Sequence, residues 1–287
     1  MVPLQNFFQT ECKPKFPERI TKRSVVCTLS SIYDPLGWVL PLLFRAKVFL
    51  QTLWKEGYEW DTTLSPHHID KWTEIYSKMM GSSKALPRNL SAKNGECCLI
   101  AFADASFEAI VISVYLRTRN SSSLLMARNK LPSFRSNKIT IPKMELDAAT
   151  RALRLMNAIL AQLRAVLKIR DVYIYSDSEI VLSWIKRQPL ANVGVRIFNR
   201  LMEIGKITRH IEIEGVKVFF GYISTDKNPA DCATRGVDQK DLIYHSWRTE
   251  PSFLCDPPET WTNKNVETAV YDDTTKMEGT NLAKPAE

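Results

Sequence analysis

Hydrophobic residues follow two different periodicities along the chain, and the change between them divides the sequence. From residue 38 to 80 apolar residues recur at helical spacing, and Ser65 followed by Pro66 is typical of a helix start. Residues 81–96, rich in Gly, Ser, Pro and Asn, predict a linker or domain boundary. Short apolar runs typical of strands follow this segment. The pattern therefore predicts a helical N-terminal part followed by a β-rich part.

The β-rich part begins with three short apolar runs and continues with alternating helices and strands. We expect strands in CCLIAFADAS, EAIVISVYLRTR and SSSLLMARNK, and then a long helix opened by Pro142. The strands DVYIYSD and KVFFGYIS follow, separated by two helices, and a short helix comes after Asn228. This order predicts an α/β fold in which helices cover the faces of a mixed sheet.

The pattern changes again near residue 238. Trp247, Phe253 and Trp261 stand among prolines, and the last 25 residues are polar. Such a composition predicts a tail, residues 238–287, that is extended and partly disordered.

Composition narrows the class of protein. The 287 residues are 45% hydrophobic, which is enough for a full core, and 39 basic against 31 acidic residues give a net charge of +8. This excess favours polyanionic partners such as nucleic acid. Six cysteines without a CxxC pair predict reduced thiols in an intracellular protein, in the cytoplasm or the nucleus.

A membrane partner is not expected. The most apolar run, GWVLPLLFRAKVFLQTLW, is interrupted by Pro41, Arg45 and Lys47, and the N-terminus lacks the pattern of a signal peptide.

Candidate chemistry is carried by carboxylates at the ends of the predicted elements. Asp104 and Asp177 each end an apolar strand. Glu145 is expected in the first turn of the long helix, and Asp231 opens the last short helix. Each has a structural alternative, because Asp177 or Asp231 can cap a helix and Glu145 suits a helix N-terminus. If the two Asp-bearing strands are neighbours, however, the four side chains meet at one edge of the sheet.

Such a cluster needs cations. Four carboxylates within a few ångströms repel one another and raise some of their pKa values. Hard oxygen ligands suit Mg²⁺ or Mn²⁺, and two such ions can activate water in phosphodiester hydrolysis. Asp147 is expected outside the cluster, because two positions beyond Glu145 a side chain points to roughly the opposite side of the helix.

These residues also carry a family resemblance. The order FADAS, ITIPKMELDAA, YSDSEIVLSWI and STDKNPADCATRG resembles the ribonuclease H-like domain of retrotransposon polyproteins, and LSSIYDPLGWVLP resembles the BEL/Pao group in particular. The resemblance covers about residues 20–237. It implies a five-stranded ribonuclease H-like domain at residues 91–237, preceded at residues 1–90 by a piece similar to the thumb or connection of a reverse transcriptase.

The resemblance also implies an activity and a catalytic set. The family's reaction is hydrolysis of the RNA strand of an RNA/DNA hybrid with two Mg²⁺ or Mn²⁺ ions, and the rest of a retroelement polyprotein is an implied partner. Catalysis and metal binding would be carried by Asp104, Glu145, Asp177 and Asp231.

Two differences from the family's usual motifs leave other functions open. Relatives often carry a histidine before the last Asp motif, where this chain has Tyr222, and often a glycine after the first Asp. The alternatives are a nucleic-acid-binding module that has lost catalysis and a structural remnant of a polyprotein.

Basic residues flank the candidate site in the sequence. Residues 109–144 contain no Asp or Glu, and a second basic stretch follows Asp177. Such stretches are often solvated faces, but here they favour contact with phosphates, with recognition through shape and the 2′-hydroxyl. The basic residues are Arg117, Arg119, Arg128, Lys130, Arg135, Lys138 and Lys143, and then Lys186, Arg187, Arg196, Arg200, Lys206 and Arg209. Ser106, Ser178 and Asn228 are expected to add hydrogen bonds to the substrate backbone.

Overall fold

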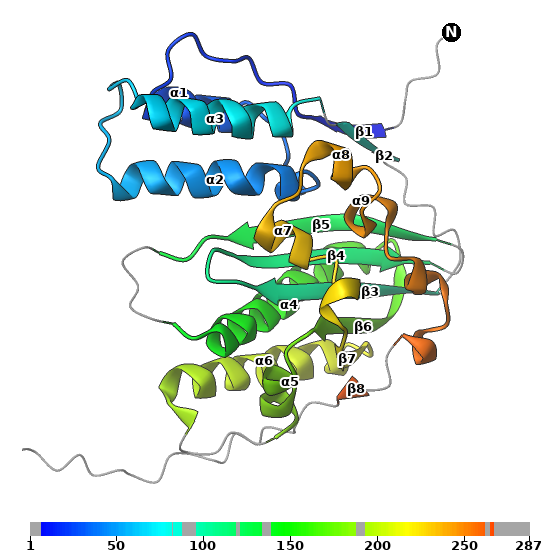
Figure 1. The fold of residues 1–287 in the computed structure, drawn as a ribbon. Coiled ribbons are helices and arrows are strands. Elements are labelled where there is room, and N and C mark those ends of the chain that lie inside the picture. The colour runs from blue at the N-terminus through cyan, green and yellow to red at the C-terminus, as the bar shows by residue number, and fades with distance from the viewer. Residues whose placement is uncertain are drawn as a thin grey trace, which may run out of the picture.

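A computed structural model describes residues 7–81, 83–87, 96–118, 121–133, 139–187, 193–261 and 265–266. Its centre is a mixed sheet in the order β5-β4-β3-β6-β7-β8 (Figure 1). The strands are β3 (Glu96–Ala105), β4 (Ile110–Arg117), β5 (Ser122–Lys130), β6 (Lys168–Ser176), β7 (Lys217–Tyr222) and the two-residue β8 (Asn265–Val266). All five strands expected from the sequence are confirmed, and β8 extends the sheet at the β7 edge.

Alternation along the strands gives the sheet two apolar faces. Strands β3, β4 and β5 are antiparallel, whereas β6 and β7 run parallel to β3. On one face, Leu99, Ala101 and Ala103 of β3 pack in a core with helices that follow in the sequence (Figure 1). These helices are α4 (Ile141–Leu163), α5 (Glu179–Lys186) and α6 (Val195–Ile213).

The other face of the sheet is covered by the N-terminal helices. They are α1 (Lys22–Ser30), α2 (Leu40–Lys55) and α3 (Pro66–Met79), beside a two-stranded sheet of β1 (Phe7–Glu11) and β2 (Ser83–Pro87). The helical character expected for residues 38–80 is confirmed. The expected linker is not a simple connection, because β2 lies within it and pairs with β1.

Helix α2 and the loop before it are attached to the edge strand β5. The Ala127 amide donates to the Leu36 carbonyl at 2.7 Å, and Trp38 Nε1 donates to the Leu125 carbonyl at 3.2 Å. Gly37 has a φ of +78°, and a Cβ there would lie 2.2 Å from the Ala127 oxygen, so only glycine allows this approach.

One hydrophobic cluster crosses the boundary expected near residue 90. It joins Trp38 and Phe44 of the N-terminal part with Phe102 and Tyr115 of the sheet, and all four side chains are buried. The N-terminal part and the sheet therefore share a core.

The segment after residue 238 differs from the expected extended tail. Residues 238–261 form α8 (Gln239–Leu242), α9 (Ser246–Thr249) and 3₁₀ turns that pack on the same face as α2 (Figure 1). Trp247 is 1% exposed, and its Nε1 donates to the Trp38 carbonyl at 2.8 Å. The prediction was wrong for these residues because several of their apolar side chains, such as Leu242, Trp247 and Leu254, are buried against a core that is distant in sequence. Except for β8, the last 25 residues lie outside the described part of the chain.

None of the described helices combines the length and the apolar character that crossing a bilayer requires.

Candidate active site

Strand pairing brings the candidate carboxylates to one edge of the sheet. Strands β3 and β6 are adjacent and parallel, with Phe102 opposite Tyr175, so Asp104 and Asp177 follow two residues later at the same edge. Helix α7 (Asp231–Arg235) packs on β3, and Asp231 is its first residue. The charge of Asp177 contributes to raising the pKa of each of the other three carboxyls, so each of them lies within electrostatic reach of Asp177.

Asp104 is the most enclosed member of the cluster. It is 7% exposed, and its Oδ2 accepts a hydrogen bond from Thr234 Oγ1 at 2.6 Å. Burial raises its pKa to about 6, an effect that the Thr234 hydroxyl opposes and the charges of Asp177 and Asp231 reinforce. Without a cation, this carboxyl is therefore half protonated near pH 6.

Glu145 lies in the second turn of α4, and the expectation of a first-turn position was wrong by one turn. Its Oε2 accepts a hydrogen bond from Ser178 Oγ at 2.6 Å. Burial raises the pKa of Glu145, the Ser178 hydroxyl opposes this, and the charge of Asp177 adds to it. The contact links α4 to the start of α5.

Asp177 does not cap α5. The N-cap is Ser178, whose Oγ accepts from the Val181 amide at 3.3 Å. Asp177 Oδ2 accepts from Thr225 Oγ1 at 2.7 Å, whereas its Oδ1 is buried and has no hydrogen-bond partner among the described residues. A buried carboxylate oxygen left without a partner is costly, and a cation is one group that can satisfy it.

Asp231 does not act as a cap either, because the N-cap of α7 is Ala230. Its Oδ1 pairs with Arg235 at 2.9 Å, one turn along the helix. Burial raises the pKa of Asp231, Arg235 opposes the shift, and Asp177 adds to it. The capping alternatives for Asp177 and Asp231 are thus excluded by the position of their neighbours.

The chemistry of these donors fits a hard divalent cation. All are carboxylate oxygens, the ligand type that Mg²⁺ and Mn²⁺ prefer, and Asp177 Oδ1 is free to bind one. Within the described ranges, no three acidic, His or Cys side chains are already drawn together in a metal-binding arrangement.

The three expected polar contacts have internal partners. Ser178 holds Glu145 and caps α5. Ser106 Oγ accepts from the amides of Glu108 and Ala109 and so shapes the turn after β3. Asn228 is buried and donates to the Ala103 carbonyl at 3.3 Å, which holds the loop before α7 against β3. These residues support the site from within the protein.

Some of the expected basic residues do lie at the site edge. Strand register places Arg128 and Lys130 on β5 beside Ile112 and Ile110 of β4, which pair with Ala103 and Ala105 of β3. Both side chains are exposed. Lys143 lies in the first turn of α4, two residues before Glu145, and Lys186 and Arg187 are exposed at the far end of α5. Arg119, Arg135 and Lys138 lie outside the described residues.

Arg117, expected to contact nucleic acid, has partners within the protein. It pairs with Cys98, six residues before Asp104 on β3, and is therefore roughly 20 Å from the carboxylates. Its Nε donates to the Leu254 carbonyl at 2.7 Å, its guanidinium also reaches the Asp256 carbonyl, and the Trp261 ring is 5.2 Å away. Arg117 thus fastens the C-terminal segment to the sheet.

Two arginines of the second basic stretch also form ion pairs within the protein. Arg196 and Arg200 on α6 both pair with Asp147 on α4, the latter at 2.6 Å. Asp147 is 5% exposed, and these partners lower its pKa despite the opposing effect of burial, which is the largest single contribution. The expectation that Asp147 is outside the cluster is confirmed. The two arginines were expected to favour contact with phosphates, whereas in the structure they join α4 to α6.

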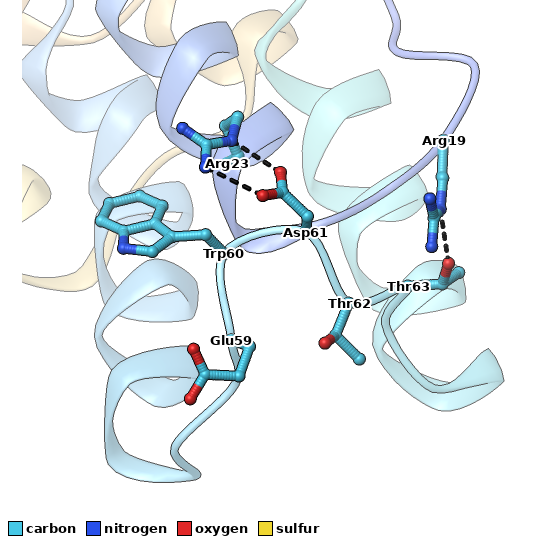
Figure 2. Close-up of a pocket in the computed structure, with 7 residues that line it drawn as sticks. All are labelled: Arg19, Arg23, Glu59, Trp60, Asp61, Thr62 and Thr63. Carbon is cyan, nitrogen blue, oxygen red and sulfur yellow. Dashed lines mark hydrogen bonds and ion pairs between the residues drawn. The ribbon is translucent and has the colours of Figure 1, made fainter.

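A hollow on the N-terminal helical part is remote from this chemistry. It measures about 750 Å³ and includes Arg19, Arg23, Trp60 and Asp61 (Figure 2). Arg23 forms two hydrogen bonds with Asp61, at 2.6 and 2.9 Å, and Arg19 donates to Thr63 at 2.7 Å (Figure 2). Because both arginines are engaged by the protein, this hollow is not the candidate site.

A family model described as the Pao retrotransposon-like RNaseH-like domain matches residues 21–178, more than half of the chain. The chain belongs to this family. The match includes Asp104, Glu145 and Asp177 and starts well before the sheet, so most of the N-terminal helical part lies within the family's region. The expected ribonuclease H-like fold is confirmed, and the family agrees with the expectation of a ribonuclease. A search of curated proteins found no match.

Solved structures with a similar backbone arrangement include ribonucleases and viral enzymes. RNase H1 from Halobacterium salinarum NRC-1 is 11% identical, with a TM-score of 0.33 over 47% of this chain and 91% of that one. LC11-RNase H1 in complex with an RNA/DNA hybrid is 19% identical, with a TM-score of 0.29 over 51% of this chain and 99% of that one. The foamy viral protease-reverse transcriptase in complex with an RNA/DNA hybrid is 15% identical, with a TM-score of 0.36 over 86% of this chain and 29% of that one.

Proposed function

We propose that the protein hydrolyses the RNA strand of RNA/DNA hybrids with Mg²⁺ or Mn²⁺ held by Asp104, Glu145, Asp177 and Asp231. The observation that carries the proposal is the convergence of these carboxylates around Asp177, whose Oδ1 is buried without a partner among the described residues. Acidic groups that raise one another's pKa destabilise the folded protein, which is a common property of functional sites. Membership of the Pao RNaseH-like family supports the choice of reaction and substrate.

Each carboxylate is held by a hydroxyl or a guanidinium, and this fixes its orientation before substrate binds. Thr234, Ser178 and Thr225 donate to Asp104, Glu145 and Asp177, and Arg235 pairs with Asp231. When bound, a pair of divalent ions would supply an activated water and stabilise the leaving oxygen. The protein's own contribution is to present fixed acceptor oxygens at one sheet edge, where the scissile phosphate of the substrate would lie.

We also propose that residues 1–90 are the thumb or connection piece of a reverse transcriptase and that residues 91–237 are the ribonuclease H-like domain. The rest of a retroelement polyprotein is the corresponding partner. The two parts would act together, because the N-terminal helices share a core with one sheet face and the family match begins at Thr21.

The experiment is a substrate panel. RNA/DNA hybrid, RNA duplex and DNA duplex of one sequence are incubated with the full chain in Mg²⁺, in Mn²⁺ and in EDTA. We expect cleavage of the hybrid alone, and only with a metal ion. Binding of the hybrid without any cleavage would instead favour the catalytically degenerate binding module, and neither binding nor cleavage would favour the structural remnant.

Replacing Asp177 is expected to change how metal ions affect stability. Without metal, Asp177→Asn removes one charge from the cluster, so the variant should melt at a higher temperature than the wild type. Mg²⁺ or Mn²⁺ should then raise the wild-type melting temperature more than that of the variant, because an ion bound only to the folded state stabilises it. Thermal melting at neutral pH across a metal titration checks this. Parallel titration curves would contradict the cluster.

Replacing Arg128 and Lys130 with Gln is expected to weaken hybrid binding equally for all sequences. The slope of log K against log salt should become shallower by about 0.7 to 0.9 for each phosphate that the variant no longer neutralises. Fluorescence anisotropy at several salt concentrations measures the slope. Lys217→Gln, at the start of β7 and hence at the opposite end of the sheet, is the matched control. A double variant with the wild-type slope would show that Arg128 and Lys130 are ordinary solvent-exposed residues that contact no phosphate.

A further inference from the structure

Beside the carboxylates, the protein has a second cleft that the catalytic set does not explain. It measures about 680 Å³ and is lined by residues from four parts of the chain, one of which is the segment Pro132 and Ser133 after β5. Helix α2 contributes its C-terminal turn, the β3–β4 turn contributes its tip, and α4 contributes its beginning. The residues that matter here are Gln51, Lys55, Phe107, Thr140, Pro142 and Met144.

The tip of the β3–β4 turn is held in place although its side chain is exposed. Phe107 is 74% exposed, which is unusual for a phenylalanine. The Ser106 amide donates to the Ala109 carbonyl at 2.8 Å, and Ser106 Oγ accepts from two amides of the same turn. Ser106 Oγ also reaches the carbonyl of Thr234, whose hydroxyl binds Asp104. An aromatic ring is therefore presented to solvent on a turn that is coupled to the site.

The opposite wall of the cleft comes from the N-terminal helical part. Gln51 Nε2 donates to the Pro132 carbonyl at 2.7 Å, and Lys47 Nζ donates to Asn129 Oδ1 at 3.0 Å, so the end of α2 is attached to β5. Lys55 follows at the end of this helix. Its side chain is exposed. A positive charge thus faces solvent at the rim of the cleft.

The cleft is close enough to the carboxylates for one substrate to occupy both. Phe107 is three residues from Asp104, a span of at most about 11 Å, and Met144 in the cleft wall is adjacent to Glu145. A duplex advances about 3.4 Å per base pair. The nucleotides next to a phosphate at the carboxylates therefore lie within reach of Phe107 and Lys55.

We propose that the cleft between α2 and the β3–β4 turn binds the strand of the hybrid adjacent to the scissile phosphate, with Phe107 packing on a sugar and Lys55 contacting a phosphate. This inference rests on the proposed function and extends it, since it makes the N-terminal helical part a direct component of the substrate site. Proteins hold single strands without sequence preference through an aromatic ring beside a cation, and the same pair can contact the sugar and the phosphate of one strand of a duplex. The apolar wall formed by Pro142 and Met144 suits the carbon atoms of a sugar.

The test is the affinity of the full chain for a dye-labelled RNA/DNA hybrid in EDTA, measured by fluorescence anisotropy. Phe107→Ala is expected to weaken binding about fivefold or more, and Phe107→Trp should retain it. Lys55→Gln should reduce the salt slope by about 0.7 to 0.9, whereas Lys217→Gln should leave it unchanged. Since Phe107 and Lys55 are exposed, all variants should keep the wild-type melting temperature.

The outcomes separate this inference from the proposed function. Phe107→Ala and Lys55→Gln variants that bind like the wild type and like Lys217→Gln would overturn the cleft assignment, even if the wild type cleaves the hybrid. Failure of the wild type to cleave would overturn the proposed reaction, while a selective loss of binding in the two variants would still support the cleft.

Discussion

Asp104→Asn is expected to reduce metal-dependent cleavage of an RNA/DNA hybrid by about a thousandfold or more. Loss of a residue that only orients a metal ligand typically costs about 10- to 100-fold, and loss of a central ligand should cost more. Asn retains the shape of the side chain and can still accept from Thr234, so the fold should persist. Initial rates with labelled hybrid at saturating Mg²⁺ check the expectation.

The matched control is Asp241→Asn, which removes an exposed carboxylate on α8. It should cleave like the wild type. Comparable rates for Asp104→Asn and the wild type would show that the reaction does not depend on this cluster.

Trp247→Ala is expected to lower the free energy of unfolding by about 3 to 5 kcal/mol, the usual cost of removing a fully buried aromatic side chain. The indole is 1% exposed and donates to the Trp38 carbonyl, so its loss would leave both a cavity and an unpaired acceptor. Chemical denaturation measures the change.

Tyr244→Ala, three residues earlier and 85% exposed, is the control and should change stability by less than about 0.5 kcal/mol. Equal stabilities of the Trp247→Ala and wild-type proteins would mean that residues 238–261 are not part of the folded core.

Strands and carboxylates were predictable because local patterns determine them. The strands carry continuous or alternating apolar runs, and Asp104 and Asp177 stand at strand ends. Their adjacency required only that β3 and β6 be neighbours, although β4, β5 and α4 lie between these two strands in the sequence. A side chain at a strand end is therefore placed by the sheet itself.

Other roles depend on partners that are distant in sequence. Arg117 resembles any other member of its basic stretch, and only the packed segment after residue 250 reveals that it binds carbonyls there. Contact with phosphates was similarly expected of Arg196 and Arg200, but both pair with Asp147 of α4. Charge patterns alone do not distinguish a phosphate contact from an internal ion pair.

The attachment of the N-terminal helices was also beyond local patterns. The Gly37 turn and the Trp38 indole give no local sign that they approach β5 some 90 residues later. The Gly/Ser/Pro/Asn-rich segment suggested separation, whereas apolar side chains on both sides of it bury one another. Shared burial across a loop can be recognised only when the partners are in place.

The most direct test of the central claim is cleavage of one RNA/DNA hybrid carrying a different fluorescent label on each strand, followed over a Mg²⁺ titration that starts in EDTA. The account predicts that only the RNA label appears in shorter products, and that the rate rises from zero with Mg²⁺. Cleavage in EDTA, or equal shortening of both strands, would contradict a metal-dependent, hybrid-specific site at the carboxylate cluster.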